Sequence, residues 1–345
     1  MINSFQRIRK VHLGDSVSKG TFLFILFVLL ISALSLKGQD PEFSQFYANP
    51  LYLNPAFTGT SALSRGSINY RNQWPNQGNT FVTNYLSYDK FVSSMRGGIG
   101  IQVMYDVQLN GIISNLNTSF LYAHHFKVND RLFFSLALEA GFIYKQYKVS
   151  GLVFPGMINQ NNGKIYGTYT LPTENGHKLI PDFSFGVVGQ KDDVYFGLAF
   201  NHLTHPDQSF IRGDELGRLP LKITFHAGTK GHEFHHGLLS RAFTLSPNLV
   251  YQQQGSFKQI NIGMYMKEDW LTFGLWFRNN LSIRPNSVVA MFGYQKEKFQ
   301  FGYSFDYTLS NLAGYGYGAH EISLIFFFGQ QHKQVFNRTI QIPQL

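Results

Sequence analysis

Aromatic residues occupy every second position of residues 298–307, KFQFGYSFDY. The positions between them hold Gln300, Gly302, Ser304 and Asp306. Successive side chains of a β-strand point to opposite faces, so this segment would have one aromatic face and one small, polar face. A soluble β-sandwich usually buries its apolar face and exposes the polar one. A polar face rich in glycine that recurs along the chain instead favours a barrel with lipid outside and a wet or filled interior.

Charged residues are scarce in this chain. They make up 14% of it and aromatic residues 16%, whereas average soluble domains carry roughly 25% charged residues. The formal net charge of +9 includes five basic residues that lie before residue 38. The remaining charge is dispersed, so no nucleic-acid partner is expected. A pair of soluble β-sandwiches stays open as the less favoured fold, because it would need a more highly charged surface.

The alternation predicts an all-β fold, a single transmembrane antiparallel barrel of about 14 strands. The strands are expected near residues 62–71, 80–90, 96–107, 112–125, 131–148, 182–190, 193–200, 220–230, 240–251, 257–267, 270–278, 286–295, 298–307 and 319–329. Short charged connections are expected at 128–130, 190–193, 267–269 and 295–297, and longer ones at 72–79, 149–181, 201–219, 279–285 and 308–318. Short periplasmic turns that alternate with long outer loops are typical of bacterial outer-membrane barrels. The turn expected at 231–239 is long for the periplasmic side.

Four segments follow from this interpretation. Residues 1–38 have a basic start, an apolar core and small residues before Gln39, which predicts a secretory signal peptide, with an uncleaved anchor helix as the alternative. Residues 39–60 hold three prolines and many aromatics, which predicts an irregular periplasmic or lumenal arm that packs against the barrel. Residues 61–329 would form the barrel and residues 330–345 a C-terminal tail. The predicted location is the outer membrane.

Residues that could carry chemistry do not form a convincing active site. The chain has no Cys, which excludes disulfides, thiolate metal sites and a cysteine nucleophile. Residues 232–236, HEFHH, match the HExxH zinc motif, but they lie between predicted strands rather than on a helix. No hydroxyl, His and acid are placed to act together in a hydrolase. We therefore expect no enzyme activity, no cofactor and no metal site.

Other polar and aromatic residues are better suited to contacts than to catalysis. Arg71 and Trp74 close the first strand, where Trp is typical of a membrane interface. His320 and Glu321 precede the last strand and could pair with inward Arg or Lys side chains. The loop at 149–181 is rich in Gly, Asn, Tyr and Pro, a composition suited to partner binding.

Seven ordered segments, spread over most of the chain, carry a family resemblance. They are DPEFSQFYANPLYLNPAFTGT (40–60), YRNQW (70–74), GGIG…D (97–106), YAHHF (122–126), PDFSFG (181–186), YFGLAFNHLTHP (195–206) and FGYSFDYTLSNLAG…GAHEISL (301–324). With these segments the chain resembles the PorP/SprF family of type IX secretion system membrane proteins of Bacteroidetes. The resemblance implies a non-enzymatic outer-membrane barrel that acts with the secretion machinery in export, gliding motility or the surface attachment of adhesins.

The resemblance also implies the partners: components of the type IX machinery, a secreted protein with a C-terminal sorting domain, and outer-membrane lipid. The residues we expect at partner-binding or structural positions are Phe43, Tyr47, Asn49, Pro50, Asn54, Pro55, Arg71, Trp74, His202, Pro206, His320 and Glu321. The arm would contact periplasmic machinery, close the barrel from below or form part of the partner site. The alternative function is a passive porin or a transporter of hydrophobic solutes.

Overall fold

The computed structural model of the chain describes residues 39–75, 81–148, 158, 176–210, 217–235, 242–281, 286–309 and 318–329. All but the first 36 residues of the chain belong to one compact unit. The predicted signal peptide and the predicted C-terminal tail lie outside the described residues, as does most of the loop at 149–181. Among the described residues, no helix has both the length and the apolar character needed to cross a membrane.

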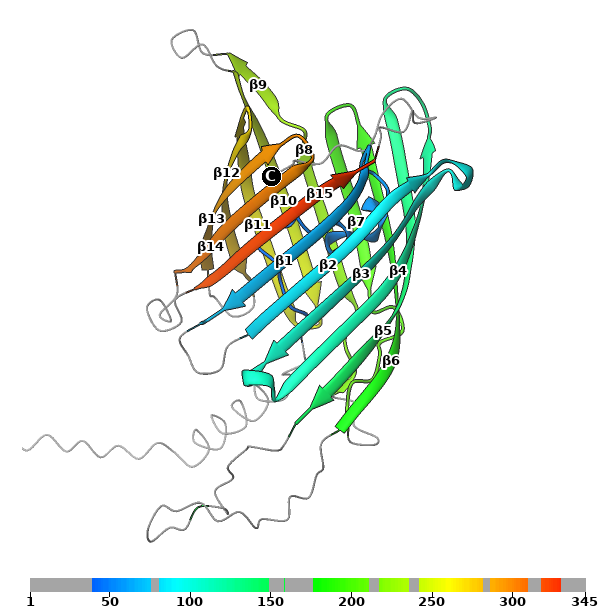
Figure 1. Cartoon of the computed structure of the whole chain (residues 1–345), viewed down its shortest axis with the longest axis vertical. Helices are drawn as coiled ribbons and strands as arrows, with labels where there is room; N and C mark the ends of the chain where they lie inside the picture. Colours follow the sequence, from blue (N-terminus) through cyan, green and yellow to red (C-terminus); the bar gives the residue numbers. More distant parts are fainter. Residues whose placement is uncertain are drawn as a thin grey trace, which may run out of the picture. The chain divides into compact units, whose positions relative to one another are not determined.

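Fifteen strands are found in the described residues, and they form one antiparallel sheet (Figure 1). They are β1 Ser64–Gln73, β2 Phe81–Val92, β3 Gly97–Gln108, β4 Ile113–Lys127, β5 Leu132–Tyr147, β6 Gly176–Lys191, β7 Val194–Asn201, β8 Lys222–Thr229, β9 His232–His235, β10 Ala242–Gln254, β11 Phe257–Glu268, β12 Leu271–Asn280, β13 Asn286–Lys296, β14 Phe299–Thr308 and β15 Ala319–Phe328. The sheet closes because β15 pairs with β1, with Ile322 opposite Tyr70. The predicted barrel is confirmed, and all fourteen predicted strands are present.

The prediction of a turn at 231–239 was wrong at its start. Residues His232–His235 form β9, which pairs with the first residues of β10. β8 pairs with the last residues of β10, along the same edge of that strand. β8 and β9 are therefore two parts of one strand line, interrupted at Lys230 and Gly231. Gly231 has a φ of +108°, a backbone conformation that residues with a Cβ rarely adopt. The break explains why the sequence resembles a turn at this position.

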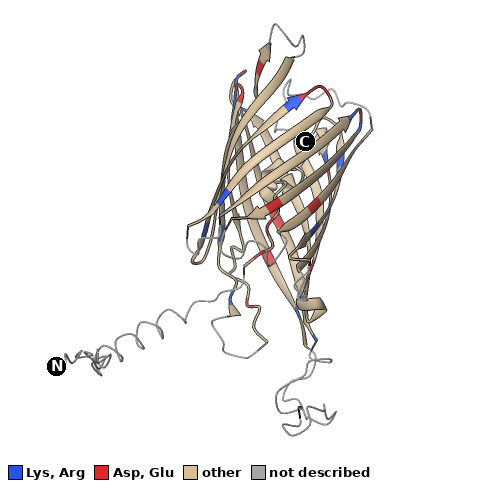
Figure 2. Ribbon diagram, turned by 90° about the vertical axis from the view of Figure 1, so that its left-hand side faces the viewer, with Lys and Arg blue, Asp and Glu red and all other residues tan. Residues whose placement is uncertain are grey.

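As expected, the barrel wall is polar on its inner face and apolar on its outer face. On β14, Gln300 and Ser304 point inward and are buried, whereas Tyr307 is half exposed on the outer face. Leu275 in the middle of β12 has 61% of its surface exposed, which is favourable only against lipid. Figure 2 shows how little of the strand surface is formed by Lys, Arg, Asp or Glu. The aromatic alternation thus marks the lipid-facing side.

The arm, residues 39–60, lies in the lumen of the barrel (Figure 1). It contains a short helix, α2 Pro50–Leu53, and a 3-10 turn, η1 Pro55–Phe57. Both begin at a proline that follows an asparagine. Proline at the first helical position has no N–H to leave unsatisfied, and its φ already suits the helix. The Asn54 side chain also accepts a hydrogen bond from the Ala56 N–H at 2.9 Å, which caps η1.

The arm runs along the lumen from one end of the barrel to the other. We call the end with connections 202–221 and 309–318 the long-loop end, and the end with turns at 128–131 and 297–298 the short-turn end. The N–H of Asp40 donates to Gln254 at 3.0 Å, and Gln254 ends β10 opposite Lys222, where β8 follows connection 202–221. Thr58 bonds through its carbonyl to His125, near the short-turn end of β4. The arm therefore begins at the long-loop end.

A charge on the lipid-facing side tests the assignment of the two faces. We expect Leu275→Arg to lower the free energy of unfolding in lipid vesicles by about 2–4 kcal/mol, the cost of Arg near the bilayer midplane. Leu281→Arg, at an exposed turn position beyond β12, is the control and should cost far less. Equal losses for the two variants in guanidinium titrations would contradict the assignment.

Candidate functional site

Glu321 on β15 is the centre of a buried polar cluster between arm and barrel. Its carboxylate is fully buried and accepts the backbone N–H groups of Ser44 at 2.6 Å and Gln45 at 3.2 Å. It also accepts Nδ2 of Asn69 at 2.8 Å and Nη1 of Arg71 at 3.2 Å. A buried carboxylate is tolerated only when it is paired and hydrogen-bonded. Asn49 Nδ2 is a fifth donor at 3.5 Å, so the arm supplies three of the five.

Arg278 and Asp306 extend this cluster toward β12 and β14. Arg278 Nη1 lies 2.5 Å from Asp306 Oδ2, and Arg278 Nη2 donates to the carbonyl of Phe43 at 3.3 Å. Arg71 Nη2 lies 3.6 Å from the same Asp306 oxygen. Two guanidinium groups thus face two carboxylates, Asp306 and Glu321, and the buried cluster has no net charge. The Ser44 hydroxyl accepts from Arg71 at 2.7 Å and holds the arm against both arginines.

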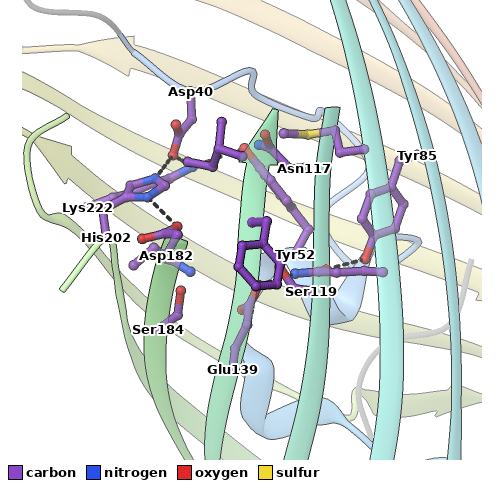
Figure 3. A pocket seen from close by; sticks show the side chains of 15 residues that line it. Asp40, Tyr52, Tyr85, Asn117, Ser119, Glu139, Asp182, Ser184, His202 and Lys222 are labelled. Carbon is purple, nitrogen blue, oxygen red and sulfur yellow. Dashed lines mark hydrogen bonds and ion pairs between the residues drawn. The ribbon is translucent and has the colours of Figure 1, made fainter. Parts of the chain in front are cut away.

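His202 fixes the first residues of the arm at the long-loop end. Its Nε2 lies 2.8 Å from Asp40 and its Nδ1 lies 2.7 Å from Asp182 (Figure 3). Lys222 Nζ is 3.6 Å from Asp40. Burial by itself lowers the pKa of His202, but the two carboxylates outweigh it and raise the pKa to about 10. Burial raises the pKa of Asp40, yet His202 and Lys222 hold it well below its usual value.

Asn54 joins the middle of the arm to three strands. Its Nδ2 lies 3.1 Å from the carbonyl oxygens of Val187 and Leu198 and 3.1 Å from Nε2 of His226. This approach requires a glycine in the wall, because a Cβ on Gly186 would lie 2.2 Å from Asn54 Oδ1. The glycine-rich inner face is therefore the surface on which the arm packs.

A second close approach occurs near the short-turn end. A Cβ on Gly98 would lie 2.2 Å from the carbonyl oxygen of Thr58. Next to it, the N–H of Gly59 donates to Asp89 at 2.7 Å, and the same carboxylate pairs with Arg65 Nε at 2.9 Å. The end of the arm is thus held by backbone contact with Gly98 and by the hydrogen bond from Gly59 to the buried ion pair of β1 and β2.

Aromatic packing supplies the apolar contacts of the arm. Phe46 lies 5.0 Å from the Trp276 ring, and Tyr47 packs edge-on between Tyr195 and Tyr265. Edge-to-face pairs of this kind contribute beyond the area they bury. These rings lie on β7, β11 and β12, and Phe43 packs at 5.6 Å on Tyr85 of β2, on the other side of the barrel. The aromatic residues of the arm therefore contact more than one side of the wall.

The structure brings nine of the twelve expected residues together at the interface between arm and wall. They are Phe43, Tyr47, Asn49, Pro50, Asn54, Pro55, Arg71, His202 and Glu321. The other three lie elsewhere. Trp74 follows β1 and packs on Phe81 at 5.6 Å, the carbonyl of Pro206 accepts the N–H of Leu219, and His320 bonds the Tyr303 hydroxyl at 2.9 Å on the outer face.

Several residues at the interface were not among those expected. They are Asp40, Arg65, Asp89, Asp182, His226, Arg278 and Asp306. For those that lie on strands, the sequence did hold a signal. Each occupies one of the alternate positions whose side chains point into the barrel, where a charged side chain must find a partner. Within the described residues, no three His, Asp or Glu side chains are grouped as a metal site, and His232–His235 of the HEFHH segment form β9.

Comparisons with known proteins find one matching family model and solved structures of low similarity. The family model described as "Type IX secretion system membrane protein PorP/SprF" matches residues 35–326. The Ralstonia pickettii toluene transporter TbuX is 11% identical, over 81% of this chain and 93% of that chain, with a TM-score of 0.48. A mutant porin of Rh. blastica is 7% identical, over 77% and 99%, with a TM-score of 0.34. No curated protein matches the chain.

Removing the Glu321 carboxylate tests the main cluster. Glu321→Ala leaves Arg71 and two arm N–H groups without their acceptor, and breaking a buried ion pair costs about 3–5 kcal/mol. We expect faster hydrogen exchange of residues 43–49, read by mass spectrometry in detergent. Asp130→Ala removes an exposed pair with Lys127 in the turn after β4 and should leave exchange in the arm unchanged. Unaltered exchange in the Glu321 variant would show that this cluster does not hold the arm.

The raised pKa of His202 predicts a pH dependence. His202 binds its proton more tightly in the folded chain. Its contribution to the stability of the fold is therefore complete below pH 6.5 and is lost as the pH rises toward about 10. The Asp40 carboxylate stabilises the fold above pH 3.8, and this stabilisation is lost as the pH falls below that value. Between pH 6.5 and 10 we expect the melting temperature of the wild type to fall relative to that of His202→Gln, which cannot titrate. Parallel profiles would contradict this role of His202.

Proposed function

The chain belongs to the type IX secretion system membrane protein family PorP/SprF, and on that basis we propose that it receives one secreted protein and holds it at the cell surface. It is a non-enzymatic outer-membrane β-barrel of the secretion system, and its membership implies association with the secretion machinery. The proposal adds the partner, a secreted protein with a C-terminal sorting domain, and the side of the barrel on which that partner binds.

The observation that carries the proposal is the direction of the arm. The arm begins beside Asp40, His202 and Lys222 at the long-loop end. Long loops of outer-membrane barrels face the cell exterior. Arm and loops therefore meet on the surface that a secreted protein would reach. The partner site proposed for this surface includes the start of the arm and residues 202–210. The loop at 149–181, proposed for the same site from its composition alone, lies mostly outside the described residues.

The machinery would bind the opposite end. At the short-turn end, β9 pairs only with β10 among the described strands, so its other edge is open there. His232 and Phe234 of β9 are exposed, and an open edge with exposed side chains can accept a further strand. We place the contact with periplasmic components on β9 rather than on the arm, which lies inside the barrel.

Co-purification from solubilised outer membrane tests the partner and its side. We expect an affinity-tagged barrel to recover a secreted protein with a C-terminal sorting domain together with machinery components. Leu203→Asp, at an exposed position of the long-loop end, should lose the secreted protein and keep the machinery. Val128→Asp also replaces an exposed aliphatic side chain with Asp, but at the short-turn end, and should keep the secreted protein. Failure to recover any such protein with the wild type would count against the proposal.

Conductance separates this function from that of a porin. Because the arm fills the lumen with buried contacts, we expect no steady conductance from the wild type in planar bilayers. A variant lacking residues 39–49 should conduct, because the wall remains and the contacts at Glu321 and His202 are gone. Steady conductance of the wild type, free of any partner, would favour the porin or transporter alternative.

A further inference from the structure

We propose that the cavity beside the start of the arm binds a hard cation of the calcium class through oxygen atoms of β4, β5 and β6. The cavity has a volume of about 50 Å³ (Figure 3). A polar cavity holds a water molecule once it offers roughly 10–15 Å³. The space is therefore sufficient for an ion that keeps a few of its water molecules. It lies among the residues that face the lumen near the long-loop end, including Asp40, His202 and Lys222.

Three buried oxygen atoms of the residues that line the cavity have no hydrogen-bond donor in the described part of the chain. They are Asn117 Oδ1, Glu139 Oε2 and Asp182 Oδ1. The second oxygen of each carboxylate is occupied: Glu139 Oε1 accepts from Gln102 at 2.6 Å, and Asp182 Oδ2 bonds His202 at 2.7 Å. A buried acceptor without a donor costs about 1–3 kcal/mol, and more when it is charged. Each oxygen therefore has a free position for an electropositive ligand.

Strand register places the three side chains on one face of the sheet, with Glu139 and Asp182 as diagonal neighbours and Asn117 four register positions from Glu139. Asn117 lies opposite Ile143, Asp182 opposite Gly141, and Glu139 opposite Ser184. Side chains two residues apart on adjacent strands are diagonal neighbours on the same face of the sheet. Gly141, between the two carboxylate positions and Ser119, has no side chain to fill the space. Figure 3 shows Asn117, Glu139 and Asp182 around the same cavity.

The charges around the cavity leave one carboxylate without a cation. Asp40 and Asp182 both contact His202, and Asp40 also faces Lys222. Glu139 is only 8% exposed, and the side-chain donors beside its carboxylate, the hydroxyl of Ser119 and the amide of Gln102, are both neutral. Three carboxylates thus share two cationic side chains. A cation bound between Glu139 and Asp182 would supply the missing positive charge beside their two free carboxylate oxygens.

The chemistry of the free oxygens selects the class of cation. Carboxylate, amide and hydroxyl oxygens are the ligands of hard cations, and Ca²⁺ accepts six to eight of them in adaptable geometry. Among the described residues, no three His, Asp or Glu side chains are grouped so that they could hold a metal ion by themselves, so neutral oxygens and water must complete the site. Two carboxylates completed by neutral oxygens and water suit a weak site, with a Kd of about 10⁻⁴–10⁻³ M as in extracellular modules.

Terbium luminescence tests the site directly. Tb³⁺ replaces Ca²⁺ and is excited through nearby tyrosines, and Tyr52 and Tyr85 line the cavity. For the purified barrel we expect tyrosine-sensitised emission that Ca²⁺ displaces at up to about 10 mM. Glu139→Gln should weaken Tb³⁺ binding at least tenfold while keeping the shape of the side chain. Asp192→Asn removes an acid at the short-turn end, where Asn tolerates the positive φ, and should bind as the wild type does.

The melting temperature gives a second reading that does not depend on luminescence. CaCl₂ should raise the melting temperature of the wild type and of Asp192→Asn, because a ligand that binds only the folded state stabilises it. It should leave Glu139→Gln unchanged, and the melting curve itself reports that this variant is folded. A wild type insensitive to Ca²⁺, or equal Tb³⁺ affinity in Glu139→Gln and the wild type, would overturn the proposal.

Discussion

The structure depends on one requirement: the polar inner face of the barrel must find hydrogen-bond partners away from bulk water. Glu321 illustrates it, because its buried carboxylate is satisfied by two backbone N–H groups of the arm as well as by Asn69 and Arg71. Each buried polar group left without a partner would cost about 1–3 kcal/mol. The arm is therefore part of the barrel's stability, because its removal would take two backbone donors from Glu321 and the Asp40 carboxylate from His202 and Lys222.

The same requirement explains the glycines. A wall that packs against backbone needs positions without side chains, and Gly98 and Gly186 provide them beside Thr58 and Asn54. Close approach then brings the Asn54 amide within reach of strand carbonyl groups. Polar pairing at the long-loop end and backbone contact toward the short-turn end fix the direction of the arm. That direction is the physical basis for placing the secreted partner at the exterior and the machinery at the other end.

Much of the barrel was predictable from the sequence because the signal is local. A period of two residues, read over segments such as 298–307, identified all fourteen strands and their lipid-facing side. β9 was missed because Gly231 and a run of His residues resemble a turn. The arm's partners could not be predicted, because Ser44 and Glu321 are separated by 277 positions in the chain and no local pattern pairs them. His320 and Glu321 were both expected to pair with inward Arg or Lys side chains, but neighbours on a strand face opposite sides, so only Glu321 reaches the lumen and pairs with Arg71.

The central claim is that the arm is seated in the lumen in this direction, and a cysteine pair tests it most directly. The chain has no Cys of its own, and a Cβ at Gly186 would lie 2.2 Å from the Asn54 side-chain oxygen. Asn54→Cys with Gly186→Cys should form a disulfide in the outer membrane, detected by mass spectrometry of the linked peptides. Asn54→Cys with Ser87→Cys, which places the second thiol on β2, should not. Absence of the first link, or equal yields from both pairs, would contradict the account.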